Sequence, residues 1–413
     1  MRLVEARVGG TSALPGRALV LVENLSVPFD RRVWQECLAL TDAGWAMTVI
    51  CPRGARRDTE PYVRLDGVEI HRYPVITATG GPAGYLREYS TAVFRTRRIA
   101  FRLAREAPFD VVQACNPPDL LLPAVRRLKT KLGASFVFDH HDLVPELYES
   151  RFRRGRDRLY RLTLKAERRT FDLADVVIAT NESYREVALS RGGKRPEDVF
   201  VVRSAPDPER FRRVEPDPSL RQGRERLIAY LGVMGPQDGV DHALRALATL
   251  ADRTDWFALF VGEGDVQPAM KELSRELGLG DRVEFTGRLP DDEVRCILST
   301  ADVGLAPDPK NPLNDVSTMN KILEYMAMEC PVVSYDLVEA RVSAGEAALY
   351  ATADDPEDFG RAIARVLDDP SLRDRLGAIG RARVEGELSW EASKKQLVRA
   401  YERAWELSRR QAP

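Results

Sequence analysis

Short apolar runs alternate with helix-forming stretches along this chain of 413 residues, and the alternation starts afresh midway. The first set of runs comprises residues 18–22, 47–51, 111–114, 135–139 and 176–180, and the second comprises residues 227–231, 256–261, 283–286, 303–306 and 331–335. Helical patterns fit between them, for example over residues 33–43 and 156–173. This rhythm is typical of βα units, which build parallel sheets covered by helices. We therefore predict an α/β fold with two doubly wound parallel-sheet domains that face each other across a central cleft.

The two sets are separated by residues 203–218, which hold four prolines and several charges, as linkers do. We place the first domain at residues 18–205 and the second at residues 206–388. Residues 389–413 contain an amphipathic helix that could cross back and brace the first domain. Residues 1–17 lack the apolar core of a signal peptide and are expected to form a flexible leader.

The composition is that of a soluble globular protein, with 44% apolar and 30% charged residues. The sequence contains no run of about 18 apolar residues, so no membrane-spanning helix is predicted. Its five cysteines are scattered and form no Cys-x-x-Cys pair. This usage favours a reducing compartment and argues against a zinc site or a disulfide framework. We expect a cytoplasmic protein that needs no metal and no cofactor.

The net charge of −1 hides an asymmetry between the two halves of the chain. Residues 1–200 hold 33 Lys and Arg against 25 Asp and Glu, whereas the remainder holds 29 against 38. Much of the excess lies in two basic clusters, residues 87–105 and 151–169. Each cluster could be a solvated helix face, or a surface that attracts anionic lipid headgroups or a phosphorylated acceptor. No nucleic-acid-binding motif accompanies the charge, so nucleic acid is not an expected partner.

The segment NDVSTMNKILEYMAMECPVVS combines a polar entry, a short helix and a strand. Three polar residues stand at the start of the helix: Ser317, Thr318 and Asn320. With the free backbone N–H groups of a helix N-terminus, they would favour an anion such as a phosphate. Lys321 adds a positive charge, and Glu324 could accept hydrogen bonds from two hydroxyls of a sugar or ribose. The segment is a candidate site for a phosphorylated, polyhydroxylated ligand; the alternative is a capped helix with a solvated Glu324.

The end of the first expected strand leads into a second candidate site. Asp30 is a good N-cap for a helix that begins at Arg31, so two arginines, Arg31 and Arg32, stand at a helix N-terminus. The helix dipole disfavours cations there, which suggests that an anion binds at this point. Pairing of these arginines with surface acids is the alternative.

Two further turns follow expected strands of the first domain. Asn116-Pro117-Pro118-Asp119 forms a stiff turn at the cleft edge, with either a structural role or a place beside the acceptor. His141 and Asp142 follow the strand at residues 135–139 and could orient or polarise a substrate hydroxyl. A third ligand at helical or hairpin spacing is missing, so a metal site is not predicted.

Glycines mark strand ends in the second domain. Gly232 begins a loop, GVMGPQDG, in which backbone can approach a ligand closely, and Gln237 lies in the same loop. The loop lacks the glycine spacing of a dinucleotide site and the lysine of a phosphate-binding P-loop, which disfavours hydride transfer and ATP hydrolysis. Gly287 and Arg288 stand at another strand end, where exposed backbone could bind the edge of a base.

Taken together, these segments resemble the GT-B nucleotide-sugar glycosyltransferases, and in particular glycosyltransferase family 4. The resemblance runs from about Ala18 to Trp405 and is carried by the order and spacing of several motifs. These motifs are LGVMGPQDGVDHAL, VGEGD, VEFTGRLPDDEV, STADVGLAPD and LEYMAMECPVVS. The resemblance implies two Rossmann-like domains facing a central cleft and a C-terminal helix that crosses back. It also implies that the second domain binds the nucleotide sugar and that the first presents the acceptor.

The same resemblance implies roles for single residues. Glu324 matches the second glutamate of the family's E-x7-E motif, which holds the ribose. Gly287 and Arg288 match the region that contacts the base and phosphates, and His141 matches a histidine that contacts the transferred sugar.

The chain departs from the family pattern at three points, one of which is the turn Phe29-Asp30-Arg31 in place of the double glycine of many relatives. Val316 stands where the first glutamate of the motif is expected, so Asp315 is the candidate substitute. Val233 and Gln237 replace the basic pair that usually binds the donor phosphates. Lys321, Arg288 or Arg31 would then have to compensate for the two missing charges.

The expected function is that of a metal-independent, retaining hexosyltransferase that moves a sugar from a nucleoside diphosphate to an acceptor hydroxyl. The acceptor would be a saccharide, a lipid-linked saccharide or a small-molecule aglycone, in polysaccharide or glycoconjugate biosynthesis. The basic first domain suggests peripheral binding at the inner face of the plasma membrane. A nucleotide-sugar 2-epimerase and a non-catalytic nucleotide-sugar-binding relative are the alternatives.

Overall fold

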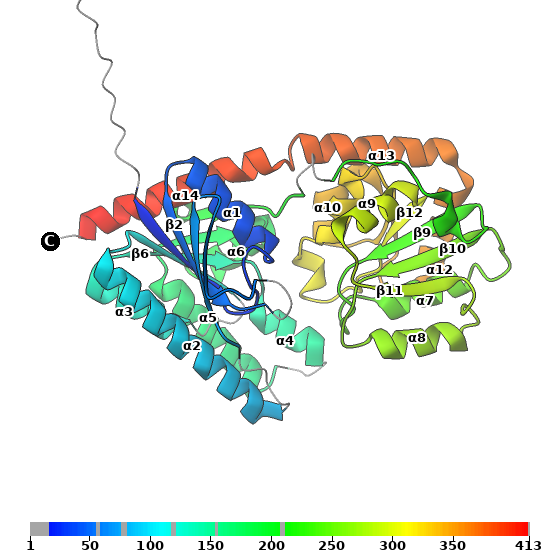
Figure 1. Ribbon diagram of the computed structural model, residues 1–413. Helices are drawn as coiled ribbons and strands as arrows, with labels where there is room; N and C mark the ends of the chain where they lie inside the picture. The colour runs from blue at the N-terminus through cyan, green and yellow to red at the C-terminus, as the bar shows by residue number, and fades with distance from the viewer. Residues whose placement is uncertain are drawn as a thin grey trace, which may run out of the picture.

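The computed structural model describes residues 16–54, 58–75, 81–116, 121–152, 156–206 and 211–411, and it shows two α/β domains side by side (Figure 1). The first domain is built on an eight-stranded sheet of order β3-β4-β2-β1-β5-β6-β7-β8, in which only the β3–β4 pair is antiparallel. Its strands are β1 Arg17–Leu21, β2 Ala46–Pro52, β3 Tyr62–Leu65, β4 Val68–Tyr73, β5 Val111–Cys115, β6 Ser135–His140, β7 Val176–Ala179 and β8 Val199–Val201. Its helices are α1 Arg31–Asp42, α2 Gly81–Glu106, α3 Leu122–Leu132, α4 Val144–Phe152, α5 Arg158–Leu173 and α6 Glu182–Ser190.

The second domain has a six-stranded, wholly parallel sheet of order β11-β10-β9-β12-β13-β14. Its strands are β9 Arg226–Leu231, β10 Trp256–Val261, β11 Val283–Gly287, β12 Val303–Ala306, β13 Val332–Tyr335 and β14 Ala348–Ala351. Its helices are α7 Val240–Ala248, α8 Gln267–Glu276, α9 Asp291–Thr300, α10 Asn320–Ala327, α11 Val338–Ala344, α12 Pro356–Asp368 and α13 Pro370–Glu385. The predicted pair of doubly wound domains is therefore confirmed.

The predicted strands all occur within one residue of their expected bounds. Four further strands, β3, β4, β8 and β14, were not predicted. β1 begins at Arg17, so the last residue of the predicted leader is part of the sheet, whereas residues 1–15 lie outside the described residues. Residues 207–210 of the predicted linker also lie outside the described residues.

The C-terminal helix α14, Trp390–Gln411, crosses back over the first domain as predicted (Figure 1). It packs on β6, β7, β8 and α1, and its buried Tyr401 donates a 2.6 Å hydrogen bond to Gln113 of β5. A single helix therefore links the C-terminal part of the second domain to the core of the first.

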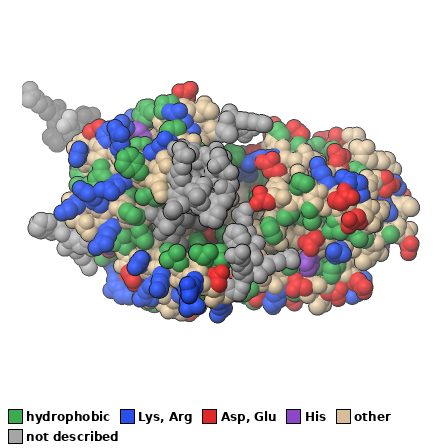
Figure 2. Space-filling model, turned by 90° about the horizontal axis from the view of Figure 1, so that it is seen from below, with side chains coloured by type: hydrophobic (Ala, Val, Ile, Leu, Met, Phe, Trp, Pro, Cys, Tyr) green, Lys and Arg blue, Asp and Glu red, His purple; other side chains and the backbone are tan. Residues whose placement is uncertain are grey.

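The charge asymmetry of the sequence is visible on the surface. Figure 2 shows Lys and Arg side chains spread over the first domain, whereas Asp and Glu side chains gather more over the second. In the part of the chain that the structure describes, no helix has the length and apolar character needed to cross a membrane.

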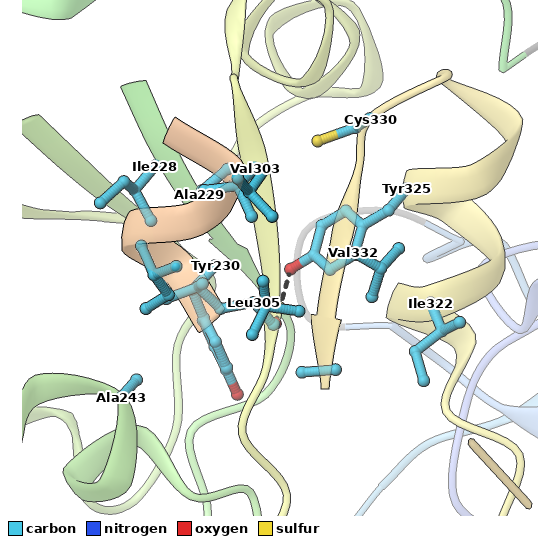
Figure 3. Close-up of a cluster of buried hydrophobic side chains, with 14 of the residues drawn as sticks. Ile228, Ala229, Tyr230, Ala243, Val303, Leu305, Ile322, Tyr325, Cys330 and Val332 are labelled. Atoms are coloured by element: carbon cyan, nitrogen blue, oxygen red, sulfur yellow. Dashed lines mark hydrogen bonds between the residues drawn. The ribbon is translucent and has the colours of Figure 1, made fainter. Parts of the chain in front are cut away.

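A buried tyrosine fixes helix α10 against the second sheet (Figure 3). The hydroxyl of Tyr325 accepts a 2.8 Å hydrogen bond from the backbone N–H of Leu231 and donates a 3.1 Å bond to the carbonyl of Leu305. Gly304 makes this approach possible, because a Cβ atom there would come within 2.6 Å of the Tyr325 ring. The anchored ring sets the position of its neighbour Glu324, which stands on the same helix.

Candidate active site

A cleft with a volume of about 1260 Å³ lies between the two domains. The first domain lines it with the loop after β1 and one face of α1, and the second with the loop after β11 and the start of α10. Both walls lie beyond carboxyl ends of parallel strands, where doubly wound sheets bind their ligands. Its charged and polar side chains include Glu23, Gln35, Arg53, Glu263, Arg288, Asp291, Asn320 and Glu324, together with Arg31.

Two arginines make contacts across this cleft. Arg31, on the first domain, pairs with Asp291, and its Nη1 lies 3.8 Å from Oε1 of Glu324. Arg288, on the second domain, lies 4.3 Å from the ring centre of Phe29 in a cation–π contact. The anion expected beside Arg31 is thus supplied, in this structure, by carboxylates of the opposite domain.

The helix start that carries Arg31 forms as predicted. Asp30 is the N-cap of α1, and its Oδ1 accepts a 3.1 Å hydrogen bond from the backbone N–H of Val33. The buried Asp30 carboxylate is therefore engaged with the helix backbone. Arg31 follows it and projects into the cleft with about half of its side chain exposed, at 49%.

The polar residues before α10 lie at a contact between the domains. Ser317 shares a 2.8 Å hydrogen bond with the hydroxyl of Tyr184, and Thr318 accepts one of 3.0 Å from the amide of Asn181. Thr318 also donates a 3.0 Å bond to the buried Glu339. Asn320, the first residue of α10, is exposed and lines the cleft. The structure thus brings Asn320 and Glu324 into the cleft and uses Ser317 and Thr318 to join the domains.

Lys321 stands one helical turn before Glu324 on α10 and is buried. Its Nζ lies 2.7 Å from Oδ1 of the buried Asp308 and 5.1 Å from the ring centre of Tyr230. Burial alone would lower the pKa of Lys321, but the charge of Asp308 outweighs it and raises the pKa. Gly232 leaves room for this lysine, since a Cβ at Gly232 would stand 3.3 Å from its Cε.

Three further residues predicted to lie at the donor site have different surroundings: Asp315, Gln237 and Gly287. Oδ1 of Asp315 accepts a 3.0 Å hydrogen bond from the backbone N–H of Val338 and so caps the start of α11. The carbonyl of Gln237 accepts a 2.9 Å bond from the amide of Asn314, which ties the glycine loop to the segment before α10. Gly287, at the end of β11, has a φ of +74° and open space around the position of a Cβ.

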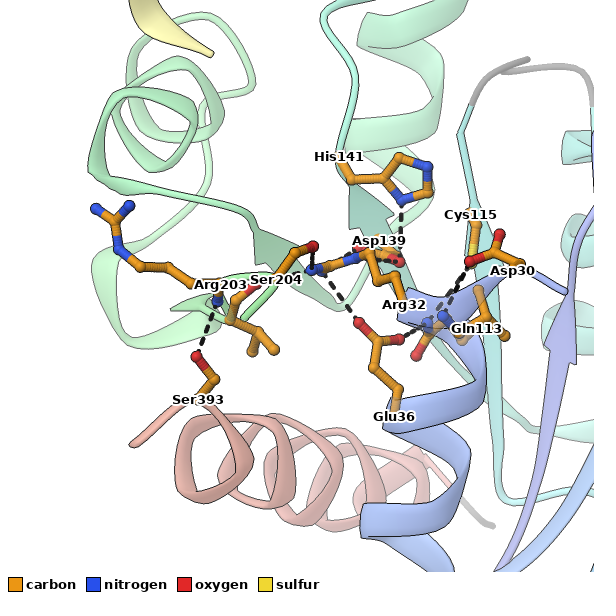
Figure 4. Close-up of polar contacts among 12 residues, drawn as sticks. Asp30, Arg32, Glu36, Gln113, Cys115, Asp139, His141, Arg203, Ser204 and Ser393 are labelled. Carbon is orange, nitrogen blue, oxygen red and sulfur yellow. Dashed lines mark hydrogen bonds and ion pairs between the residues drawn. The ribbon is translucent and has the colours of Figure 1, made fainter. Parts of the chain in front are cut away.

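A buried polar network lies beneath the first-domain side of the site (Figure 4). Figure 4 shows Asp139 between the guanidinium of Arg32 and the imidazole of His141. Asp139 lies 2.9 Å from Arg32 and 3.2 Å from Nδ1 of His141. Glu36 lies 3.1 Å from Arg32 and accepts a 2.8 Å bond from Gln113. Both carboxylates therefore contact the guanidinium of Arg32, and Asp139 also contacts the imidazole of His141.

The network shifts the pKa values of its members. Burial alone would raise the pKa of Asp139, but Arg32 and His141 outweigh it and hold that pKa well below its ordinary range. Burial would lower the pKa of His141, but Asp139 raises it to about 9, so the imidazole is a cation at neutral pH. Burial, with the charge of Asp139, raises the pKa of Glu36 to about 7.

Glu36 gives the stability of the protein a measurable pH dependence. Its pKa is higher in the folded chain than the ordinary 4.5, so the folded state binds the extra proton between about pH 4.5 and 7. This contribution is fully present below pH 4.5 and is lost as the pH rises to about 7. We expect the fall in the free energy of unfolding between pH 5 and 7 to be smaller in Glu36→Gln than in the wild type. Urea unfolding at several pH values measures the free energy of unfolding of both proteins. If it falls equally steeply with pH in both, the raised pKa of Glu36 is contradicted.

Asn116 holds the turn that carries His141 and Asp142. Its Oδ1 accepts hydrogen bonds from the backbone N–H groups of His141, at 2.9 Å, and Asp142, at 3.1 Å. Its amide donates a 2.7 Å bond to the carbonyl of Asp142. Asn116 therefore acts on the backbone of the turn, while Pro117 to Asp119 lie outside the described residues. Burial raises the pKa of Asp142.

Several residues of this arrangement were not singled out from the sequence. Asp139 and Gln113 interrupt apolar strands, and Glu36 stands on the buried face of α1. A polar residue at a position where the pattern predicts an apolar one is the signal that could have found them. Asp291 carried no such signal, because acids are common in the first turn of a helix. In the described part of the chain no three His, Cys, Asp or Glu side chains lie together as a metal site requires.

Two family models match the chain and together cover most of both domains. The model described as "Glycosyl transferase 4-like domain" matches residues 30–205, and the model described as "Glycosyl transferases group 1" matches residues 225–369. The boundary between the two matches falls between the two sheets.

Curated relatives match about half of the chain. The 2-deoxystreptamine glucosyltransferase of Streptomyces kanamyceticus is 29% identical over 220 residues, which cover 51% of this chain and 56% of that protein. The MMP alpha-(1->4)-mannosyltransferase of Mycolicibacterium hassiacum is 30% identical over 212 residues, which cover 51% of this chain and 49% of that protein. The chain thus spans about half the length of the curated relatives it matches.

Solved structures share the whole fold. Sucrose-phosphate synthase from Thermosynechococcus elongatus superposes with a TM-score of 0.76 at 20% identity and covers 93% of this chain and 98% of that one. Anabaena Alr3699/HepE in complex with UDP-glucose superposes with a TM-score of 0.69 at 16% identity, over 93% of this chain and 98% of that one. The matched models and the shared architecture agree with the resemblance found in the sequence: the chain belongs to the GT-B glycosyltransferases, of the group 1 and family 4-like kind.

Proposed function

We propose that the chain transfers a hexose-like sugar from a nucleoside diphosphate to an acceptor hydroxyl, with retention of configuration and without a metal. The observation that carries the proposal is the convergence of Glu324, Asn320 and Arg288 on one wall of the cleft between the domains. A carboxylate suits the hydroxyls of a ribose, and a guanidinium beside a helix N-terminus suits a diphosphate. A structural neighbour, Anabaena Alr3699/HepE, was solved in complex with UDP-glucose.

In this proposal the second domain binds the donor. Glu324 holds the ribose, Gly287 leaves space for the base, and Arg288 with the N-terminus of α10 balances the charge of the diphosphate. Lys321 adds positive potential from beneath, reduced by its partner Asp308. Gly232 and Gln237 bring backbone close to the donor. Asp315 faces the sugar only if it leaves its place at the start of α11.

The first domain supplies the acceptor and one cation. The imidazolium of His141, oriented by Asp139, contacts the transferred sugar, with Asp142 beside it. The acceptor oxygen attacks the anomeric carbon on the face from which the diphosphate departs. One C–O bond forms as the other breaks, and the acceptor proton passes to the departing phosphate oxygen. Stabilising the departing charge is then the main task of the protein.

Thermal denaturation with a panel of UDP-, GDP-, ADP- and dTDP-sugars tests the proposal. A ligand that binds only the folded state stabilises it by about 2.7 kcal/mol at a concentration of 100 times its Kd. We expect one nucleotide class to raise the Tm and the corresponding free nucleotide to be released once an acceptor is added. The proposal fails if no member of the panel changes the Tm.

We further propose that the enzyme works at the inner face of the plasma membrane, on acceptors for polysaccharide or glycoconjugate synthesis. The support is a basic face formed by the neighbouring helices α2 and α3. Its exposed cations are Arg97, Arg98, Arg102, Arg105, Arg126, Arg127 and Lys131. None of these cations is in an ion pair with a described residue. Phe94 stands among them with 64% of its surface exposed, as a side chain that can enter a bilayer interface.

Charge reversal on this face should release the protein from membranes. We expect the wild type to float with vesicles of phosphatidylcholine and phosphatidylglycerol at low salt. The triple variant Arg98→Glu, Arg102→Glu, Arg126→Glu should bind at least about a hundredfold more weakly, since each cation near an anionic surface contributes about 1 kcal/mol and each new anion is repelled. The matched control reverses three exposed cations of the second domain, Lys271, Arg365 and Arg375. Equal flotation of both variants would rule out this face as the membrane contact.

A further inference from the structure

The first-domain wall of the cleft carries a group of apolar side chains: Leu25, Pro28, Trp34, Leu38 and Val75. Leu25 and Val75 are large apolar residues with 39% and 44% of their surface exposed. Exposed apolar surface inside a cleft is costly in water and commonly marks a binding surface.

The fold brings these five residues together from three segments of the chain. Trp34 and Leu38 are one helical turn apart on α1 and so share one of its faces. Leu25 and Pro28 lie in the loop between β1 and α1, and Val75 lies two residues after the end of β4. β2 separates β1 and β4 in the sheet, so the carboxyl ends of all three strands lie at one edge. We call these five residues the apolar wall.

The opposite wall has a different character. It presents Arg288, Asp291 and Glu324, which suit the phosphates and hydroxyls of a donor. The apolar wall offers no such partners to a donor, although the same side of the cleft is also lined by the polar residues Glu23, Asn24, Ser26, Arg31, Gln35 and Arg53. A ligand that covers both surfaces therefore combines a polar part against the second domain with an apolar part against the apolar wall.

We propose that the apolar wall binds an apolar aglycone of the acceptor, so that the acceptor is amphipathic. The inference rests on the proposed function, because it assigns the second-domain wall to the donor. The hydroxyl that receives the sugar would stand at the polar side of the cleft, with the aglycone covering Trp34 and Leu38. An aliphatic chain and an aromatic ring share this chemistry, and the test below separates them.

The probes are methyl, butyl, hexyl, octyl and phenyl β-D-glucopyranosides, each kept below its micelle concentration and titrated calorimetrically into the full chain. Burial of one methylene corresponds to about a threefold to fourfold gain in affinity. We expect affinity to rise about threefold per methylene from butyl to octyl. A steady rise in affinity from methyl to octyl identifies an alkyl chain as the natural aglycone. Tighter binding of the phenyl than of the hexyl glucoside identifies an aromatic ring. Affinity that is the same for methyl and octyl glucoside overturns the inference.

Two variants locate the binding surface. Leu25→Asn changes an exposed loop residue with little expected effect on folding, and Leu38→Ala shortens a side chain of the wall. Both should weaken octyl glucoside binding about tenfold or more while leaving methyl glucoside unchanged, since two or more buried methylenes are lost. The control is Leu162→Ala on α5, where the leucine is 58% exposed and lies outside the cleft. A chain-length dependence that persists in both cleft variants places the apolar group elsewhere and overturns the inference.

The failure of this inference can be told from that of the proposed function. Nucleotide-sugar stabilisation is measured separately, without any glucoside. If a nucleotide sugar raises the Tm but chain length has no effect, the acceptor inference alone is wrong. If chain length matters but no nucleotide sugar binds, the apolar wall stands and the transferase assignment fails.

Discussion

Replacement of Glu324 by alanine is expected to abolish the thermal stabilisation by the nucleotide sugar and to reduce sugar transfer at least a hundredfold. The carboxylate stands on α10, lines the cleft and keeps 22% of its side chain exposed. It can accept hydrogen bonds from two ribose hydroxyls at once. Hydrogen bonds to a charged group contribute about 1.5–3 kcal/mol each, so losing two of them costs a hundredfold or more in affinity.

The fold should survive this substitution. Helix α10 is held by Tyr325, whose hydroxyl bridges β9 and β12, and by the buried Leu323 and Met326. Glu324 itself points away from that core, towards Arg31. An unchanged Tm of the ligand-free variant would show that any loss of donor binding is local.

A matched control removes the same charge from the same domain. Glu293 is exposed in the first turn of α9 and is not among the residues that line the cleft. We expect Glu293→Ala to keep the donor-induced rise in Tm. If Glu324→Ala keeps it as well, Glu324 does not hold the ribose and the donor must bind elsewhere.

The parallel sheets could be predicted from the sequence because their strands are buried on both faces. Such strands are continuous apolar runs, as β10 illustrates with Trp256–Val261, in which every residue is buried. The β3–β4 hairpin was missed because β3 lies at the sheet edge with mostly exposed residues. A local signal for it was present: Asp66-Gly67 joins the two strands with positive φ angles of 46° and 83°. Asp-Gly between two strands is a strong indicator of a two-residue hairpin turn.

The part of the site that lies beyond the strand ends of the second sheet could be predicted from the sequence. Arg288, at a strand end, and Glu324, on the helix that precedes β13, were both expected to contact the donor, and both line the cleft. The partners of polar side chains could not be predicted in this way. Ser317 meets Tyr184, 133 residues away, and Thr318 meets Asn181, 137 residues away. Only the packing of the two domains determines which hydroxyls face a ligand and which join the protein to itself.

Asp139→Ala is expected to lower the free energy of unfolding by about 3–5 kcal/mol, the usual cost of breaking a buried ion pair. Its carboxylate is fully buried between Arg32, at 2.9 Å, and His141, at 3.2 Å. Removing it leaves the largely enclosed cations of Arg32 and His141 without their shared acid, with Glu36 as the neighbouring acid that still faces Arg32. Urea unfolding at pH 7 measures the loss. The surface pair Arg168–Asp172 provides the control, since Asp172→Ala should cost no more than about 1 kcal/mol.

A second substitution at Asp139 separates a structural role of this residue from a role in the active site. In Asp139→Asn the ring of His141 keeps a hydrogen-bond partner but loses the neighbouring charge, so the pKa of His141 should fall from about 9 towards its ordinary value of 6.5. As the pH rises, the imidazolium would then lose its proton at a lower pH than in the wild type. If the transferred sugar needs this cation, the alkaline limb of the pH–rate profile should shift to lower pH by the same amount. NMR titration of the imidazole, assigned by comparison with His141→Gln, gives the pKa independently of turnover. If the imidazole pKa shifts but the pH–rate profile does not, Asp139 has only a structural role and the charge of His141 does not take part in the reaction.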